Sequence, residues 1–282
     1  YESEIIAGNT ERMERLTKLV TPFMMRRLKS DVLKELPDKL EAITYAVMDP
    51  VQAKIYYAVE QNLRESLNRQ RLELKQGTSF DLRRIEVLAE ITKLRQVCCD
   101  PHIIYDNYTG GSGKLDTILE LTQYAISSKE KVLIFSQFTT YLSIIANNLK
   151  DLGISFYTIT GATPKQMRVN LVNAFNNDDT PVFLVSLKAG GTGLNLTGAS
   201  VVIHADPWWN AAAQNQATDR AHRIGQNKAV SVHKVITKDT IEERILALQD
   251  AKADLAQTIL DAEGIAIGQL SADDLIELLS SR

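Results

Sequence analysis

Two arginines lie three residues apart in the segment QATDRAHRIGQ, residues 216–226. On a helix, Arg220 and Arg223 would share one face, so that two guanidinium groups could project together into one crevice. Such a pair can act as arginine fingers, which stabilise the charge that develops on a transferring phosphoryl group. The alternative is a solvated pair bridged to Asp219 and neighbouring acids, and the segment alone does not decide between the two interpretations.

A glycine-rich loop precedes the arginines in the segment SLKAGGTGLNLTGAS, residues 186–200. Gly190, Gly191 and Gly193 would let the backbone approach a ligand closely and point amide groups at an anion. Lys188 can meet a phosphate as a point charge. The segment therefore suggests phosphate contact, with an ordinary glycine turn as the alternative.

The segment GGSGK, residues 110–114, resembles a phosphate-binding loop but fails the pattern. That pattern requires a glycine five residues before the Gly-Lys pair and Ser or Thr after it, whereas Tyr108 and Leu115 occupy these positions. No other segment of the sequence fits the pattern. We therefore expect a bound nucleoside triphosphate to be held mainly by residues outside this sequence, and we expect the chain alone not to hydrolyse ATP.

Short apolar runs alternate with helical patterns in residues 113–282. This alternation predicts an α/β fold, in which a parallel sheet carries helices on both faces and C-terminal helices follow. The runs expected to form strands are 132–135, 156–159, 182–185, 201–204 and 230–235. Residues 1–112 predict a helical subdomain, with one strand near 41–48 that could lie at a sheet edge. The segment 107–113, rich in Gly, Ser and Thr, marks the expected domain boundary.

Small polar, glycine, lysine and tryptophan residues follow the expected strands. Because the carboxyl ends of parallel strands meet at one edge of a sheet, these residues should form one rim. Such a rim suits a phosphate-bearing polymer. Either tryptophan could stack against nucleic acid or anchor its loop in the core, and we expect one of the two to be free. The rim residues are Ser136, Gln137, Thr160, Gly161, Ser186, Lys188, Asp206, Trp208 and Trp209.

The composition indicates a globular intracellular protein. Of the 282 residues, 44% are hydrophobic and 24% charged, which excludes a disordered chain. No apolar stretch is long enough to span a membrane, and two adjacent cysteines with four scattered histidines predict neither disulfides nor a metal site. The first residue is Tyr1, so we expect a piece of a longer polypeptide. The location would be cytoplasmic or nucleoid in a bacterium and nuclear in a eukaryote.

The net charge of −3 leaves binding to nucleic acid open. From Asp239 to the end there are ten acidic and three basic residues, so the remainder carries 25 acidic and 29 basic residues. A local basic groove suffices for phosphate contacts whatever the total charge.

Three segments in this order and spacing resemble the Swi/Snf-type branch of the superfamily-two helicase-like ATPases. They are KVLIFSQF at 131–138, the glycine loop, and DRAHRIGQ at 219–226. PFMMRRLKSDVLKELPDK at 22–39 and LRQVCCDPHII at 94–104 are similar to the helical insert that precedes the second RecA-like lobe of this family. The resemblance implies a RecA-like lobe and an ATP-dependent translocase that moves on double-stranded DNA and remodels DNA-bound complexes.

The resemblance also implies roles for matching positions. Arg220 and Arg223 would reach the triphosphate, and Gly191, Gly193 and Gln216 would line the nucleotide edge of the cleft. Most of the ATP site and the Mg²⁺ site would belong to a first RecA-like lobe that this sequence lacks. The residues that would follow the backbone of one DNA strand are Ser136, Gln137, Thr160, Gly161, Ser186, Lys188 and Trp209.

Two other functions remain open from the sequence. A regulatory or scaffold module could keep the fold and bind a protein partner such as RNA polymerase through the helical half and the acidic tail. A translocase acting on RNA would differ mainly in the reading of the 2′-hydroxyl group, which the sequence does not reveal.

Overall fold

The computed structural model describes residues 15, 36–74, 80–190 and 193–258. Residues from Pro37 onward form one compact unit, and the other unit, Tyr1–Leu36, lies almost wholly outside the described residues. The described elements are β1 (Lys39–Ala46), α4 (Pro50–Leu74), α5 (Phe80–Cys99), the 3₁₀-helix η2 (Pro101–Ile103), α6 (Gly113–Ser127), β2 (Val132–Ser136), α7 (Thr139–Asp151), β3 (Phe156–Ile159), α8 (Lys165–Asn177), β4 (Val182–Ser186), α9 (Leu187–Gly190), β5 (Val201–His204), α10 (Ala211–Thr218), β6 (Val230–Thr237) and α11 (Ile241–Thr258).

Six strands form one parallel sheet in the order β1-β6-β5-β2-β4-β3. The five predicted runs are all strands of this sheet, and the predicted α/β fold with a parallel sheet is confirmed. β1 corresponds to the strand that the sequence placed near 41–48, and it lies at an edge, paired with β6. The helices α4 and α5 are thus inserted between two strands of one sheet. The predicted domain boundary near 112 stays a prediction.

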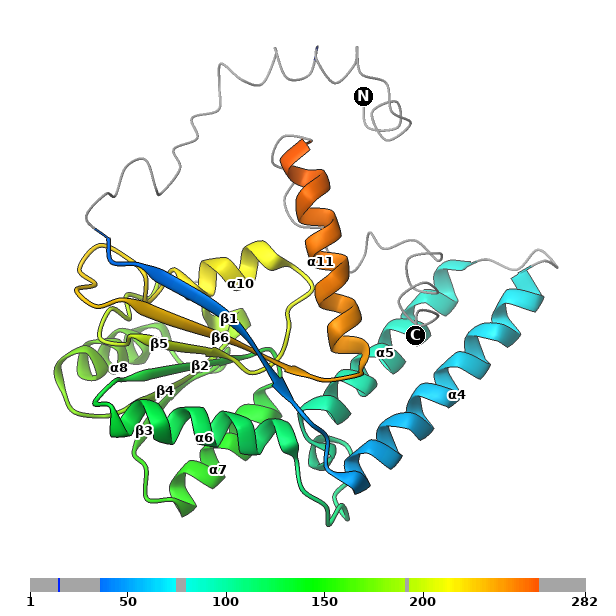
Figure 1. Ribbon diagram of the computed structural model, residues 1–282, viewed down its shortest axis with the longest axis horizontal. Coiled ribbons are helices and arrows are strands. Elements are labelled where there is room, and N and C mark those ends of the chain that lie inside the picture. Colours follow the sequence, from blue (N-terminus) through cyan, green and yellow to red (C-terminus); the bar gives the residue numbers. More distant parts are fainter. Residues whose placement is uncertain (1–14, 16–35, 75–79, 191–192, 259–282) are drawn as a thin grey trace. The chain divides into compact units, whose positions relative to one another are not determined.

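Helices cover both faces of the sheet because alternate strand residues point to opposite sides. Leu133 and Phe135 of β2 belong to one core cluster, to which α8 and α10 contribute, while Val132 and Ile134 belong to a second cluster with α6 and α7. Figure 1 shows α10 on one side of the sheet and α6 and α7 on the other. The central strands β2 and β4 are buried along their whole length, as expected for strands covered on both faces.

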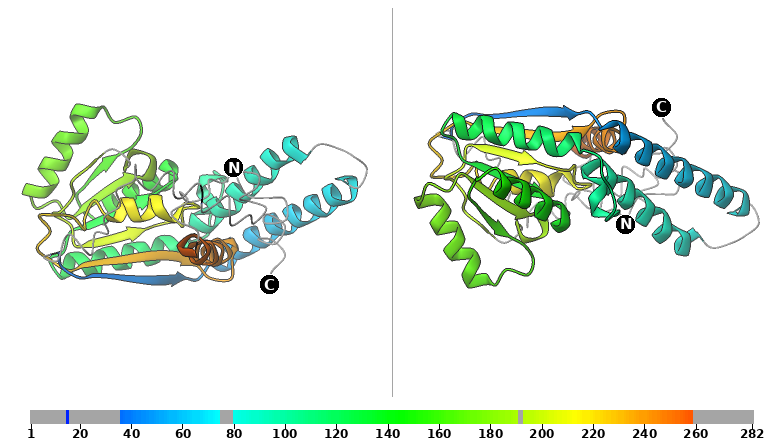
Figure 2. Two further views of the ribbon diagram at one scale, coloured as in Figure 1. Left: turned by 90° about the horizontal axis from the view of Figure 1, so that it is seen from above. Right: turned by 90° about the horizontal axis from the view of Figure 1, so that it is seen from below.

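The hairpin of α4 and α5 starts where β1 ends, and its two helices lie side by side in Figures 1 and 2. Pro50 opens α4, and the Asp49 carboxylate accepts a hydrogen bond from the Val51 amide at 2.8 Å, which supports the first turn of the helix. A third core cluster joins the hairpin to α11, through residues that include Tyr56, Leu94 and Ile245.

In the described ranges, no helix is long and apolar enough to cross a membrane.

Candidate functional site

The predicted rim residues follow β2, β3, β4 and β5, which are neighbours in the sheet. Since all strands are parallel, the structure brings these loops to one edge, here called the carboxyl edge. It is the position at which open parallel sheets bind ligands. The side chains at this edge nevertheless differ in how accessible they are.

The two predicted residues of the loop after β2 differ in burial. Ser136 is fully buried, and its hydroxyl donates a hydrogen bond to the Asp206 carboxylate at 2.5 Å. The Gln137 amide donates to the same carboxylate at 3.1 Å, but the Gln137 side chain is only half-buried, and its Nε2 has no hydrogen-bond partner among the described residues. Of the two residues, only Gln137 has accessible side-chain surface, although its Nε2 is buried.

The loop after β3 is held by an arginine that the sequence analysis did not single out. The Arg168 guanidinium donates hydrogen bonds to the carbonyl groups of Thr163 at 2.7 Å, Gly161 at 3.0 Å and Thr160 at 3.3 Å. Gly161 is exposed and Thr160 is half-buried. Three carbonyls on one guanidinium fix the turn that would present the backbone of Thr160 and Gly161.

The loop after β4 contains the predicted glycine turn. The buried Ser186 hydroxyl accepts a hydrogen bond from the Ala189 amide at 3.3 Å, and Lys188 lies in the short helix α9. Gly191 lies outside the described residues. Gly193 is exposed with φ of +51°, a left-handed conformation that favours glycine.

Arg220 and Arg223 follow α10, which ends at Thr218, so the prediction that they share a helix is wrong. Asp219 is the C-cap of α10, and the chain then turns, with Gly225 in a left-handed conformation at φ of +99°. Arg220 is largely buried and Arg223 is exposed. The two guanidinium groups are nevertheless close enough for Arg223 to influence the charge of Arg220.

The electrostatics of Arg220 suit an anion. Burial lowers the pKa of Arg220, the adjacent Arg223 lowers it further, and Asp219 opposes both effects. The Arg220 Nε has no hydrogen-bond partner among the described residues. A buried guanidinium nitrogen without a partner, next to a second arginine, is stabilised by a negatively charged ligand.

The turn that carries the arginines is fixed against the segment that follows the glycine turn. The Arg220 carbonyl accepts a hydrogen bond from the Leu196 amide at 2.9 Å. The buried Gln226 side chain donates to the carbonyls of Thr197 at 3.1 Å and Ala199 at 2.7 Å. The structure therefore joins two motifs that the sequence could only list separately.

Gln216 is exposed on α10, two residues before that helix ends.

Both tryptophans are half-buried, contrary to the expectation that one is free. Trp208 packs against the core cluster of α8 and α10, while Trp209 packs against the cluster of the hairpin, with the Arg95 guanidinium 5.4 Å from its ring centre. Each ring anchors its loop, and only part of it faces outward.

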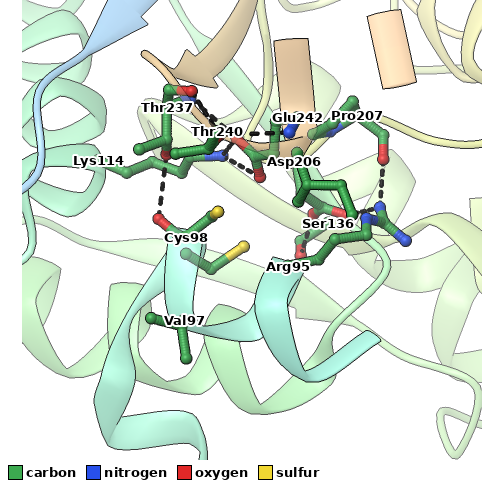
Figure 3. Close-up of polar contacts among 12 residues, drawn as sticks. Arg95, Val97, Cys98, Lys114, Ser136, Asp206, Pro207, Thr237, Thr240 and Glu242 are labelled. Carbon is green, nitrogen blue, oxygen red and sulfur yellow. Dashed lines mark hydrogen bonds and ion pairs between the residues drawn. The ribbon is translucent and has the colours of Figure 1, made fainter. Parts of the chain in front are cut away.

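Lys114 of the GGSGK segment is a buried structural residue. Its Nζ donates to both carboxylate oxygens of Glu242, at 2.6 and 2.5 Å, and neither side chain is exposed (Figure 3). Burial alone would lower the pKa of Lys114, but Glu242 raises it, and the net pKa lies above its ordinary value. Lys114 therefore neutralises Glu242, which agrees with the failed phosphate-loop pattern.

Among the described residues, no group of three or more His, Cys, Asp or Glu side chains could hold a metal ion.

Comparisons with known proteins assign the chain to a family. The model of the helicase conserved C-terminal domain matches residues 113–225, and that of the SNF2-related domain matches residues 1–103. The solved structure of the C-terminal domain of a Sulfolobus solfataricus SWI2/SNF2 ATPase is 30% identical, with a TM-score of 0.68, and the match covers 86% of this chain and 99% of that one. The chain belongs to the SNF2 family.

Two further relatives of this SNF2 chain are longer proteins, of which the chain matches only a part. The SWI2/SNF2 ATPase core of Sulfolobus solfataricus, solved in complex with double-stranded DNA, is 31% identical, with a TM-score of 0.69 over 95% of this chain and 56% of that one. An uncharacterized ATP-dependent helicase of Mycoplasma pneumoniae is 39% identical over 267 residues. The match spans 93% of the SNF2 chain but only 25% of that helicase. The parallel sheet with its helices is therefore the RecA-like fold of SNF2 ATPases.

Proposed function

We propose that this SNF2 chain is the second motor lobe of an ATP-dependent translocase that moves on double-stranded DNA and remodels DNA-bound complexes. The observation that carries the proposal is the arginine turn, hydrogen-bonded to the segment after the glycine turn, with an unpartnered buried Nε on Arg220. ATP bound between this lobe and a first lobe would place its phosphates beside Arg220 and Arg223. The same chain offers polar side chains and backbone groups along the carboxyl edge.

In this proposal the two arginines are fingers that stabilise the charge developing on the phosphoryl group during hydrolysis. Gly191, Gly193 and Gln216 line the nucleotide edge of the cleft. The first lobe supplies most of the ATP site and holds Mg²⁺, so the chain alone is inactive as an ATPase.

DNA contact falls to the carboxyl edge. The accessible side chains and backbone groups are those of Gln137, Thr160 and Gly161, with the outward part of Trp209 beside them. Lys188 adds a positive charge at the end of β4. The buried hydroxyls of Ser136 and Ser186 support the loop backbones, so these two side chains would act on DNA contact only by holding the loops in place.

The salt dependence of DNA binding by the complete polypeptide tests this proposal. If the carboxyl edge binds phosphates, affinity falls steeply with salt, and Lys188→Ala reduces the slope of log K against log salt by about 1. Lys150→Ala is the matched control, because Lys150 is an exposed lysine in the last turn of α7. A flat salt response of the parent would contradict DNA translocation and favour a scaffold that binds a protein partner such as RNA polymerase. Competition between DNA and RNA duplexes decides the substrate.

A further inference from the structure

Arg95 of α5 contacts both loops that flank the middle of the carboxyl edge. Its guanidinium lies 3.6 Å from the Asp206 carboxylate and donates a hydrogen bond to the Pro207 carbonyl. The ring centre of Phe138 is 5.6 Å away and that of Trp209 is 5.4 Å away. These four partners belong to the segment after β2 and the segment after β5, and Arg95 itself is only 1% exposed.

Asp206 completes the link between the two loops. Its carboxylate accepts hydrogen bonds from the Ser136 hydroxyl at 2.5 Å and from the Gln137 amide at 3.1 Å, and it is fully buried. Figure 3 shows Arg95, Asp206, Ser136 and Pro207 grouped together, with α5 supplying Arg95. The carboxylate thus ties the loop after β2, and the guanidinium ties both loops to the hairpin.

The end of α5 is itself fixed to the rest of the unit. The Cys98 carbonyl accepts a hydrogen bond from the Thr237 hydroxyl at 3.1 Å, and the Cys99 carbonyl accepts one from the Ser112 hydroxyl at 2.7 Å. Gln52 of α4 donates to the Val97 carbonyl at 2.8 Å. Arg95 is therefore presented from a rigid element, as a residue that positions others must be.

We propose that Arg95 is a positioning residue for the DNA-contacting edge: it holds the loops after β2 and β5 in the one arrangement in which Gln137 and Trp209 meet the same DNA strand. The inference rests on the proposed function. Lysine keeps the positive charge but has a shorter side chain and no planar head group, so Arg95→Lys should weaken the contacts that the guanidinium makes with the rings of Phe138 and Trp209.

The test uses the complete polypeptide and measures ATP turnover as a function of DNA concentration. Arg95→Lys should raise the DNA concentration for half-maximal stimulation about three- to tenfold, the range expected for losing one or two such contacts, with turnover at saturating DNA changed less than about twofold. Asp206→Asn, which keeps the shape of the carboxylate, should give a similar rise. The double variant should be no worse than the more affected single one, because the two residues act as one unit.

Glu60→Gln is the matched control. Glu60 is a largely buried carboxylate that pairs with Arg64 and Arg244, at 3.4 and 2.9 Å, outside both loops. It should lower thermal stability without changing the DNA dependence. If Arg95 had only a structural role, Arg95→Lys and Asp206→Asn would likewise lower thermal stability without changing the DNA dependence.

Three outcomes separate the claims. Suppose that Arg95→Lys and Asp206→Asn both leave the DNA concentration for half-maximal stimulation unchanged, while Lys188→Ala flattens the salt response. This result would overturn the positioning role and leave the proposed function standing. If either Arg95→Lys or Asp206→Asn does not fold, the result for the other variant decides whether the positioning role holds. A parent protein with a flat salt response would overturn both.

Discussion

Replacing Lys114 by Met should destabilise the chain strongly, because it leaves a carboxylate buried without its cation. Lys114 and Glu242 have no exposed side-chain surface, and the Glu242 carboxylate also accepts a hydrogen bond from the Thr237 amide at 2.8 Å. Methionine keeps the apolar stem of lysine and removes only the ammonium group. The perturbation is therefore the loss of one partner from a buried ion pair.

The expected cost is about 3–5 kcal/mol in the free energy of unfolding, the usual range for breaking such a pair from one side. The double variant Lys114→Met/Glu242→Gln should recover at least about half of this loss, because a neutral amide needs no cation and its oxygen can still accept from Thr237. The second substitution should therefore raise the free energy of unfolding of the Lys114→Met variant, whereas two independent deletions would each lower it.

Urea unfolding of the chain, followed by far-ultraviolet circular dichroism, measures these values. Lys150→Met, at an exposed position, is the control and should change stability by less than about 0.5 kcal/mol. A loss below about 1 kcal/mol for Lys114→Met, or a double variant less stable than the single one, would refute the reasoning.

Two further predictions follow from buried titratable groups. Burial lowers the pKa of His204 to about 3 from 6.5, so the unfolded state takes up a proton first as pH falls, and stability present above pH 6.5 is lost below it. Between pH 6.5 and 5 the loss is about 2 kcal/mol, and His204→Gln should remove this share of the pH dependence; an equal loss in the variant would contradict the assignment. Burial also raises the pKa of the Cys98 and Cys99 thiols, so a thiol reagent should modify neither until the chain unfolds; reaction of the native protein would show that the end of α5 is open.

The sequence predicted the elements well because their signals are local. The five apolar runs became strands, and the strand expected near 41–48 became β1. The partner of β1 could not be predicted, since its pattern records a half-buried strand but not the strand beside it. Arg220 and Arg223 were considered as a pair on a helix because they lie three residues apart, but α10 ends before them, at Thr218.

The interactions that hold the candidate site were outside the reach of local patterns. Arg95 bonds the Pro207 carbonyl across 112 positions, and Lys114 bonds Glu242 across 128. Ser136 was expected at the surface because it follows an apolar run, but its hydroxyl is buried and donates a hydrogen bond to the Asp206 carboxylate. The partners of these buried charges are far apart in the sequence and are brought together only by the fold. Such pairs therefore cannot be predicted until the order of the strands is known.

The most direct test of the central claim is ATP turnover by the complete polypeptide carrying Arg223→Ala, with Arg64→Ala as a control on α4. If Arg220 and Arg223 complete a triphosphate site, Arg223→Ala should reduce DNA-stimulated turnover by about a thousandfold or more, while DNA binding and the control remain close to the parent. Parental turnover in the Arg223→Ala variant would contradict the account.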